Sequence, residues 1–292
     1  MIDEKICPDY KLQALWDALY EIYEIFSQIC DNHGLRYYAF AGTLLGTIRH
    51  KGFIPWDDDL DVAMPRPDYE KFIELANKEL PTHLKFVYWK NTPEFNMLFG
   101  KIQDSRKGKV LQLEENLGHK LSNGVYIDIF PIDGYPKGRF YRTYLKYRDL
   151  LLLPIERFRL YKWSQLGRRG RCAWLVGAVL SIFIPWMRKQ YQFMRLHENE
   201  LLKTSYEDSE FVSDVGLRYN VLSQPVLKKE KWGNPVNREF GEKSIKIQEG
   251  HVEYLEKKFG DYMKLPPISQ RKPSHQYSWR CPWWLGPTFT NG

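Results

Sequence analysis

The stretch that decides the fold is AGTLLGTIRHKGFIPWDDDLDV, residues 41–62. Three carboxylates stand at alternating positions near its end: Asp57, Asp59 and Asp61. Successive residues of a β-strand point to opposite faces of the sheet. A strand that begins near Trp56 would therefore place all three acids on one face, while Leu60 and Val62 face the core.

Such a group of carboxylates predicts a cation site. Clustered negative charges repel one another unless a cation compensates them. The divalent ions Mg²⁺ and Mn²⁺ prefer oxygen ligands of this kind. The alternative is an acidic loop whose carboxylates are solvated at the surface.

Gly42 and Thr43 precede the acids and predict a phosphate site. A strand over residues 35–40 is expected to turn here into a short helix over residues 44–49. Glycine lets the backbone approach a ligand closely, and a helix N-terminus offers free N–H groups to phosphate oxygens. A phosphate site followed by a metal-binding strand is the arrangement that phosphoryl transfer requires. An ordinary strand-to-helix turn is the alternative.

A further acid, Asp128, stands inside the apolar run VYIDIF at residues 125–130. A buried aspartate needs a partner, because burying an unpaired charge is costly. Backbone N–H groups or an arginine could satisfy it. Alternatively, it completes the metal site or accepts the proton of an attacking hydroxyl. Asp133 is expected to be a turn residue before Gly134.

Two cations lie near these motifs, Arg49 before the acids and Lys101 in the segment FGKIQDS at residues 99–105. Phosphate transfer needs positive charge near the non-bridging oxygens. Arg49 is the first candidate to contact a donor phosphate or to hold the acids in place, and Lys101 is the second. A surface cation without a specific role is the alternative for each.

Together, these motifs resemble the signature of the LicD family, the phosphocholine transferases of bacterial cell-surface glycans. That family belongs to the nucleotidyltransferase-fold superfamily and has relatives of the fukutin type. The matching segments are GTLLGTIRHKGFIPWDDDLDVAMPRPDYEKF (42–72), FGKIQDS (99–105), NGVYIDIFPIDG (123–134) and, more loosely, EYLEKKFGDYMKLPP (253–267). The resemblance implies an α+β fold, with a small mixed β-sheet flanked by helices and an additional C-terminal helical region.

The resemblance also implies roles for the acids. In the superfamily pattern, alternating acids stand between apolar residues on a strand, which favours Asp59 and Asp61 as metal ligands. Asp57 would be a third ligand or a support for the other two, and Asp58 would point the opposite way. A third carboxylate stands on a later strand in this superfamily, which favours a catalytic or metal-binding role for Asp128.

The activity implied by the resemblance is transfer of phosphocholine from CDP-choline to a glycan hydroxyl, with release of CMP. The acceptor would be a teichoic acid, a lipopolysaccharide precursor or a lipid-linked glycan, and the cofactor Mg²⁺ or Mn²⁺. A choline group needs aromatic faces around it. The aromatic residues closest to the motifs are Trp56, Tyr88, Trp89 and Tyr126. Three alternatives stay open: transfer of the nucleotide itself, use of another CDP-alcohol, and a non-catalytic glycan- or membrane-binding protein.

Composition fits a globular enzyme with anionic partners. The chain has 292 residues, a net charge of +7 and high aromatic content, with 10 Trp, 19 Tyr and 16 Phe. A basic surface suits nucleotides, teichoic-type polymers or an anionic membrane. The sequence has no zinc-ligand spacing or RNA-recognition motif, so nucleic acid is not an expected partner. The four widely spaced cysteines and the charged N-terminus favour a cytoplasmic location.

Hydrophobic spacing predicts the remaining organisation. Helices are expected over 9–33, 67–80 and 254–262, and strands over 84–89, 95–103 and 124–130. Residues 1–135 would form the nucleotidyltransferase-like catalytic core, and residues 136–292 a mainly helical region packed on it. The two parts could also form a single domain.

The uncharged segment CAWLVGAVLSIFIPWM, residues 172–187, follows three arginines. It is shorter than the roughly 20 residues of a membrane-spanning helix, and Pro185 interrupts it. Two interpretations stay open. The segment is either a buried core helix or a helix that dips into the anionic inner leaflet of the plasma membrane with its arginines on the headgroups.

Overall fold

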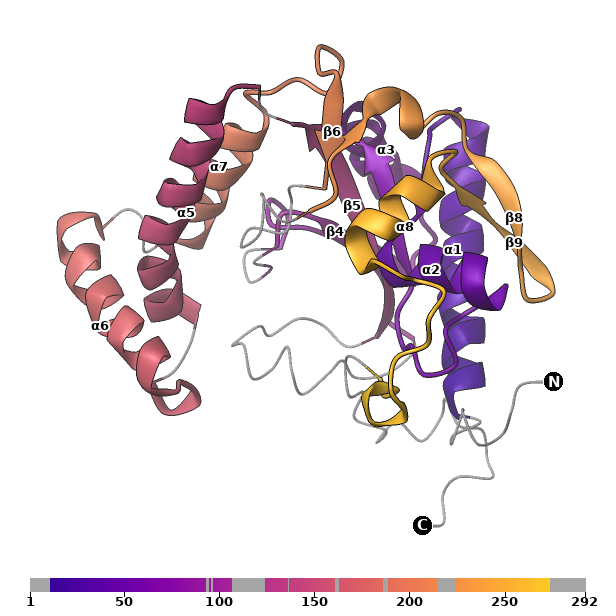
Figure 1. Ribbon diagram of the computed structural model, residues 1–292, viewed down its shortest axis with the longest axis horizontal. Helices are drawn as coiled ribbons and strands as arrows, with labels where there is room; N and C mark the ends of the chain where they lie inside the picture. Colours follow the sequence, from indigo (N-terminus) through magenta and orange to yellow (C-terminus); the bar gives the residue numbers. More distant parts are fainter. Residues whose placement is uncertain are drawn as a thin grey trace.

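The computed structural model describes residues 11–92, 95, 97–106, 124–135, 137–160, 163–185, 189–214 and 224–273. Helices and strands alternate from α1 to α3, and three further strands follow in the described part of the chain (Figure 1). In order, these elements are α1 (Lys11–Asn32), β1 (Tyr38–Ala39), α2 (Ala41–His50), β2 (Asp61–Pro65), α3 (Arg66–Glu79), β3 (Leu84–Val87), β4 (Gly100–Asp104) and β5 (Val125–Gly134). The predicted α+β class is confirmed.

The strands form one small mixed sheet in the order β1-β2-β5-β4-β3. The central strands β2 and β5 run parallel, while the other pairs along this path are antiparallel. Two short strands extend it from the end of β5: β6 (Phe211–Ser213) pairs with β5, and β7 (Leu227–Lys228) pairs with β6. The predicted mixed sheet flanked by helices is therefore confirmed.

One face of the sheet packs against α1 and α3. Aromatic rings connect the layers: Phe86 of β3 lies 5.6 Å from Phe72 of α3, and Phe72 lies 5.0 Å from Phe26 of α1. Ile102, next to Phe86 in the ladder, shares this face and is fully buried. Because side chains alternate along a strand, the residues between these apolar positions point to the opposite face.

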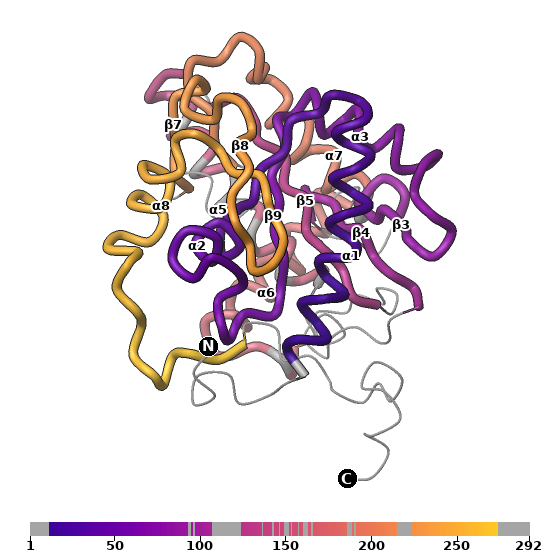
Figure 2. Tube along the Cα trace, turned by 90° about the vertical axis from the view of Figure 1, so that its right-hand side faces the viewer, coloured from indigo at the N-terminus to yellow at the C-terminus, as the bar shows by residue number. Residues whose placement is uncertain are grey.

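The opposite face lies under α8 (His251–Phe259), which is adjacent to α2 in both views (Figures 1 and 2). Phe40, at the start of α2, contacts the rings of Phe130 on β5 and Tyr254 on α8, with centroid distances of 5.2 and 5.4 Å. Helix α8 fulfils the expectation of a helix near 254–262, one turn earlier than predicted. The sheet face that α8 covers is the one that carries the predicted acids.

The strand that carries the acids begins later than predicted. β2 starts at Asp61, not near Trp56, so the preceding acids lie in a loop. The reason is the length of the neighbouring strands. β1 has only two residues, and β5 begins to pair with β2 at Asp61. The expectation that Asp57, Asp59 and Asp61 share one strand face was therefore wrong.

Helix α2 begins earlier than predicted, at Ala41. Ala41 has a backbone φ of 42°, which is rare for a residue with a side chain. This conformation turns the chain abruptly from β1 into the helix. As a result, Gly42 and Thr43 belong to the first helical turn and do not precede it.

The second half of the chain contains strands as well as helices. Its helical part comprises α5 (Arg139–Leu160), η1 (Trp163–Gln165), α6 (Arg168–Phe183) and α7 (Gln190–Leu201), which stand to one side of the sheet (Figure 1). After β6 and β7 come η3 (Lys229–Lys231), a hairpin of β8 (Val236–Phe240) and β9 (Lys243–Ile247), α8, and η4 (Ile268–Gln270). The division of the chain at residue 135 stays a prediction.

Asp133 is not the turn residue that the sequence predicted. It is buried in β5, which continues to Gly134, and it forms a two-bond ion pair with Arg66 at the start of α3. Arg66 Nε and Nη2 donate to the two Asp133 oxygens at 2.6 and 2.8 Å. The pair fixes α3 to the sheet, because neither charge is stable in the interior without the other.

Asp133→Ala is expected to lower the free energy of unfolding by about 3 kcal/mol, because it leaves the buried Arg66 guanidinium without its main partner. Urea denaturation measures this change. The matched control is Glu239→Ala, which breaks an exposed ion pair with Lys51 and is expected to cost less than about 1 kcal/mol. Similar losses in both variants would contradict the assigned role of the buried pair.

Candidate functional site

A row of charged side chains crosses three strands on the sheet face that α8 covers. Asp61 on β2 is directly beside Asp128 on β5, and Lys101 on β4 is beside Asp128 on the other side. All three are buried, and Lys101 Nζ lies 3.4 Å from Asp128 Oδ1. The sheet register therefore brings together three of the residues predicted from the sequence.

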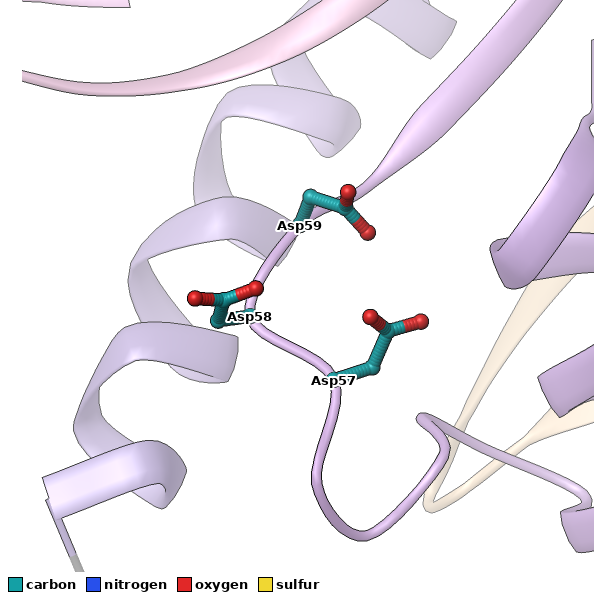
Figure 3. Close-up of side chains that lie close together, drawn as sticks. All are labelled: Asp57, Asp58 and Asp59. Carbon is teal, nitrogen blue, oxygen red and sulfur yellow. The ribbon is translucent and has the colours of Figure 1, made fainter. Parts of the chain in front are cut away.

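The loop before β2 adds three more carboxylates. Oxygens of Asp57, Asp58 and Asp59 lie within 4.8 Å of one another. Figure 3 shows the carboxylates of Asp57 and Asp59 turned to one side of the loop and that of Asp58 turned to the other. Asp58 is completely buried. The loop thus directs two acids and the following strand residue toward one region.

Electrostatics show how closely these acids are grouped. The pKa of Asp61 is raised well above its usual value of 3.8, first by burial and then by the negative charges of Asp59, Asp128 and Asp57. The ammonium of Lys101 opposes this rise. Three neighbouring carboxylates therefore raise the pKa of Asp61, and Lys101 opposes them from within the sheet.

The donor set fits a hard divalent cation. It consists of carboxylate oxygens, and within the described residues no histidine or cysteine belongs to the group around Asp61. Oxygen-only sites of this kind suit Mg²⁺ or Mn²⁺ better than zinc or copper. A divalent ion would also offset the excess negative charge that raises the pKa of Asp61.

Thr43 and Gly42 hold the acids against the first turn of α2. The Thr43 hydroxyl accepts a hydrogen bond from the Asp61 backbone N–H at 2.8 Å. A Cβ at Gly42 would lie 2.8 Å from Asp57 Oδ2, so a larger residue there would require that carboxylate to move. The helix N-terminus and the acids are therefore neighbours. Binding of phosphate by Gly42 and Thr43 stays a prediction.

Arg49 reaches the C-terminal segment of the described chain. Its Nη1 donates to the carbonyl oxygen of Tyr262 at 2.9 Å, and its Nε donates to His50. Burial and the charge of Arg271 lower the pKa of Arg49, whereas the charge of Asp57 raises it. Arg49 thus interacts electrostatically with Asp57. It also holds the segment after α8 by its hydrogen bond to Tyr262.

Sequence reasoning missed Lys258 and Tyr254 of α8 and Asp214 just after β6, which lie near Asp61. Burial lowers the pKa of Lys258, and the carboxylates of Asp214 and Asp61 oppose this effect. Tyr254 is buried in the same region, where burial and the charges of the same two acids raise its pKa. Lys258 lies in the segment 253–267, whose loose family resemblance was the available signal.

An aromatic cavity of about 810 Å³ adjoins the acidic loop. Its aromatic side chains are Trp16, Tyr20, Phe53, Trp56 and Phe240, and its acidic ones are Asp17 and Glu242. Trp16 Nε1 donates to the Asp57 carbonyl oxygen at 2.8 Å, which joins the cavity wall to the loop. Two other aromatic candidates lie elsewhere: Tyr126 faces Lys101 Nζ at 3.5 Å, and Trp89 packs near α7.

Comparison with known proteins agrees with this geometry. Residues 34–156 match the model of the LicD/FKTN/FKRP nucleotidyltransferase domain. Residues 34–156 thus form a domain of the LicD family. The matched range contains the first helical turn of α2, the acidic loop and the row Asp61–Asp128–Lys101, so the family domain includes most of the candidate site. Lys258 and Tyr254 lie outside this range.

Two relatives show how far the similarity extends. The chain is 28% identical over 262 residues to the lipopolysaccharide cholinephosphotransferase LicD of Haemophilus influenzae, covering 87% of this chain and 92% of that protein. It is 27% identical over 146 residues to an uncharacterized protein of Rickettsia prowazekii, covering 49% and 46% of the two chains. The first similarity therefore extends beyond the family domain over the arm of helices formed by α5, α6 and α7.

Asp61→Asn is expected to stabilise the metal-free protein at neutral pH. The native state holds the Asp61 proton more tightly than the unfolded chain, so stability falls as pH rises from about 4 through the raised native pKa. The variant lacks this loss. Thermal unfolding in EDTA across this pH range should give a higher Tm for Asp61→Asn than for the wild type above the native pKa.

Adding Mg²⁺ should raise the Tm of the wild type and have little effect on Asp61→Asn, because the ion binds the native acids. Asp208→Asn, at an exposed acid outside the site, is the control and should behave as the wild type does. A lower neutral-pH Tm for Asp61→Asn in EDTA would contradict the repulsion assigned to this position.

Proposed function

We propose that this LicD-family protein transfers phosphocholine from CDP-choline to a hydroxyl group of a cell-surface glycan or its lipid-linked precursor, releasing CMP. The observation that carries the proposal is the row Asp61–Asp128–Lys101 beside the acidic loop. Similarity over most of the chain to a lipopolysaccharide cholinephosphotransferase supports the choice of transferred group. The cytoplasm, where nucleotide-activated donors are made, is the proposed location.

The acids are the proposed metal ligands. Asp57, Asp59, Asp61 and Asp128 would hold Mg²⁺ or Mn²⁺, and Asp59, Asp61 and Asp128 are the proposed catalytic residues. A bound divalent cation would neutralise the diphosphate and stabilise the oxygens that enter and leave the phosphorus. The unusual density of carboxylates around Asp61 supports this assignment.

In the reaction, the acceptor hydroxyl oxygen forms a bond to the phosphorus of the phosphocholine group. The bond from that phosphorus to the oxygen of CMP breaks, and its electron pair leaves with CMP. The hydroxyl proton passes to a carboxylate, for which Asp128 is the proposed base if it is not itself a ligand. The Lys101 ammonium, whose Nζ lies 3.4 Å from Asp128 Oδ1, would stabilise the negative charge of that carboxylate.

Positive groups around the acids would bind the donor phosphates. The first turn of α2 presents backbone N–H groups and Thr43 next to Asp61. Lys101 approaches from the sheet, Lys258 from α8, and Arg49 from the end of α2. Charges on several sides suit a diphosphate better than a single phosphate, because a diphosphate presents oxygens in more directions.

The aromatic cavity beside the acidic loop is the proposed site of the choline group. A quaternary ammonium cannot donate hydrogen bonds and binds to aromatic faces, often with a carboxylate nearby. The cavity offers five aromatic side chains together with Asp17 and Glu242, and it is also lined by Lys51 and Lys243. Lys243 Nζ already lies 4.2 Å from the Tyr20 ring centroid, so a choline group would have to displace this lysine or bind to the other rings. Its contact with Asp57 through Trp16 connects this site to the acids.

The direct test is incubation with Mg²⁺, a glycan acceptor and CDP-choline labelled in the choline group. We expect CMP release and transfer of the label to the acceptor. Asp59→Asn and Asp61→Asn should each reduce transfer to less than about one hundredth of wild type while the protein stays folded. Asp208→Asn is the control. Near-wild-type transfer by either site variant would contradict the metal assignment.

Product analysis separates the alternatives. Transfer of the cytidine nucleotide without CMP release would identify a nucleotidyltransferase. A panel of other CDP-alcohols, each followed by CMP release, identifies the donor group. A strong preference for a donor without a quaternary ammonium would contradict the choline assignment of the aromatic cavity.

Lys258→Met is expected to lower kcat/KM for the donor by about 10- to 100-fold, because it removes a cation that faces Asp61 from α8. Lys258→Arg should retain more activity, since it keeps the charge. The control is Lys257→Met, at the neighbouring exposed lysine on the same helix, which pairs with Glu253. Equal activity of the two Met variants would remove Lys258 from the proposed site.

A further inference from the structure

The outer face of α6 exposes a continuous apolar stripe. The side chains of this stripe are Leu175, Val176, Val179, Ile182 and Phe183, and they are between 50% and 78% exposed. The other four side chains follow Leu175 by one, four, seven and eight residues, which places all five on one side of the helix. The buried-core interpretation of this segment was therefore wrong, because these five apolar side chains are exposed.

The inner face of α6 is fixed against α5. Gly177 and Ser181 are buried there, and a Cβ at Gly177 would lie 1.9 Å from the Pro154 carbonyl oxygen. Only glycine permits such a close approach of the two helices. Because the contact with α5 determines which side of α6 faces inward, the apolar stripe is held outward.

Basic residues border this stripe. Arg168, Arg169 and Arg171 occupy the first turn of α6, and all three are exposed. Helix α6 contains no acidic residue, and its positive N-terminal end adds to the charge of the arginines. Trp163 is 42% exposed and lies under Arg171, with the guanidinium carbon 5.5 Å from the ring centroid. Tryptophan and arginine are typical of the membrane–water interface.

We propose that the α6 stripe docks on an anionic lipid leaflet. The helix would lie along the surface, with the three arginines at the lipid phosphates and the apolar side chains among the upper acyl chains. No helix within the described ranges is long and apolar enough to cross a bilayer. This inference concerns where the protein acts and goes beyond the proposed reaction.

An anionic membrane fits the stripe better than a second copy of the chain does. Each copy carries a net charge of +7, so pairing through this basic region would bring like charges together. A leaflet supplies both required surfaces at once, negative phosphates beside an apolar layer. The positive charge of the three arginines beside the stripe therefore favours an anionic lipid surface over a second copy of the chain.

Flotation with vesicles tests the docking. The full chain is mixed with vesicles of phosphatidylcholine alone, or with about one-third phosphatidylglycerol. We expect flotation with the anionic vesicles and much weaker flotation with the neutral ones. The double variant Leu175→Asp/Phe183→Asp should bind anionic vesicles at least about tenfold more weakly. Arg168→Glu/Arg169→Glu should also lose binding, by about fivefold or more for each residue.

Ile268→Asp is the matched control, because Ile268 is an equally exposed apolar residue outside α6. It should float as the wild type does. Circular dichroism and transfer to a soluble acceptor should be unchanged in all variants, which separates this test from that of the reaction. Equal flotation of the wild type and Leu175→Asp/Phe183→Asp would overturn the proposal. So would a wild-type dimer that this double variant dissociates, since a second copy would then cover the stripe.

Discussion

The central constraint on the candidate site is that the sheet holds mutually repelling carboxylates at neighbouring positions. Parallel pairing aligns Asp61 with Asp128, and adjacent strands lie about 4.8 Å apart, so the two side chains cannot separate without breaking the ladder. The loop adds Asp57 and Asp59, and burial removes the water that would screen them. The fold therefore maintains a concentration of negative charge that a free chain would avoid.

Two aspartates on β5, Asp133 and Asp128, lie in different electrostatic surroundings. Asp133 is matched by Arg66 in a two-bond ion pair that joins α3 to the sheet. Asp128, on the opposite face, shares Lys101 with a group of other acids. Arg66 also pairs with Glu70, so the first site is a closed group of ion pairs. The second site instead gathers several carboxylates around Asp61, and such a group of oxygen ligands suits a divalent cation.

Sequence reasoning named several of the residues that the fold brings together around Asp61, because they combine unusual chemistry with a clear pattern. Acids beside apolar residues marked Asp61 and Asp128, and Gly42 followed by Thr43 marked the helix start. It could not place the beginning of β2 or the partner of Asp133, because both depend on which strands and helices are neighbours in space. Lys258 was missed for the same reason. Whether α6 is buried was also undecided, since an apolar sequence does not show whether its side chains contact protein or are exposed.

The candidate site and the arm of helices, α5 to α7, occupy separate parts of the structure. The sheet and its covering helix α8 hold the acids and the nearby lysines in fixed positions. The arm stands to one side of the sheet (Figure 1). The apolar stripe of α6 is exposed on this arm. In the proposed function, the first part acts on the donor while the second brings the protein to the surface where a lipid-linked acceptor is found.

The most direct measurement is a crystal structure of the protein grown with Mn²⁺, in which anomalous scattering locates the ion. The account predicts an ion bound by oxygens of Asp61 and Asp128, together with Asp57 or Asp59, at distances near the ~2.1 Å typical of Mg²⁺ sites. An ion bound elsewhere, or no ion among these carboxylates at saturating Mn²⁺, would contradict it.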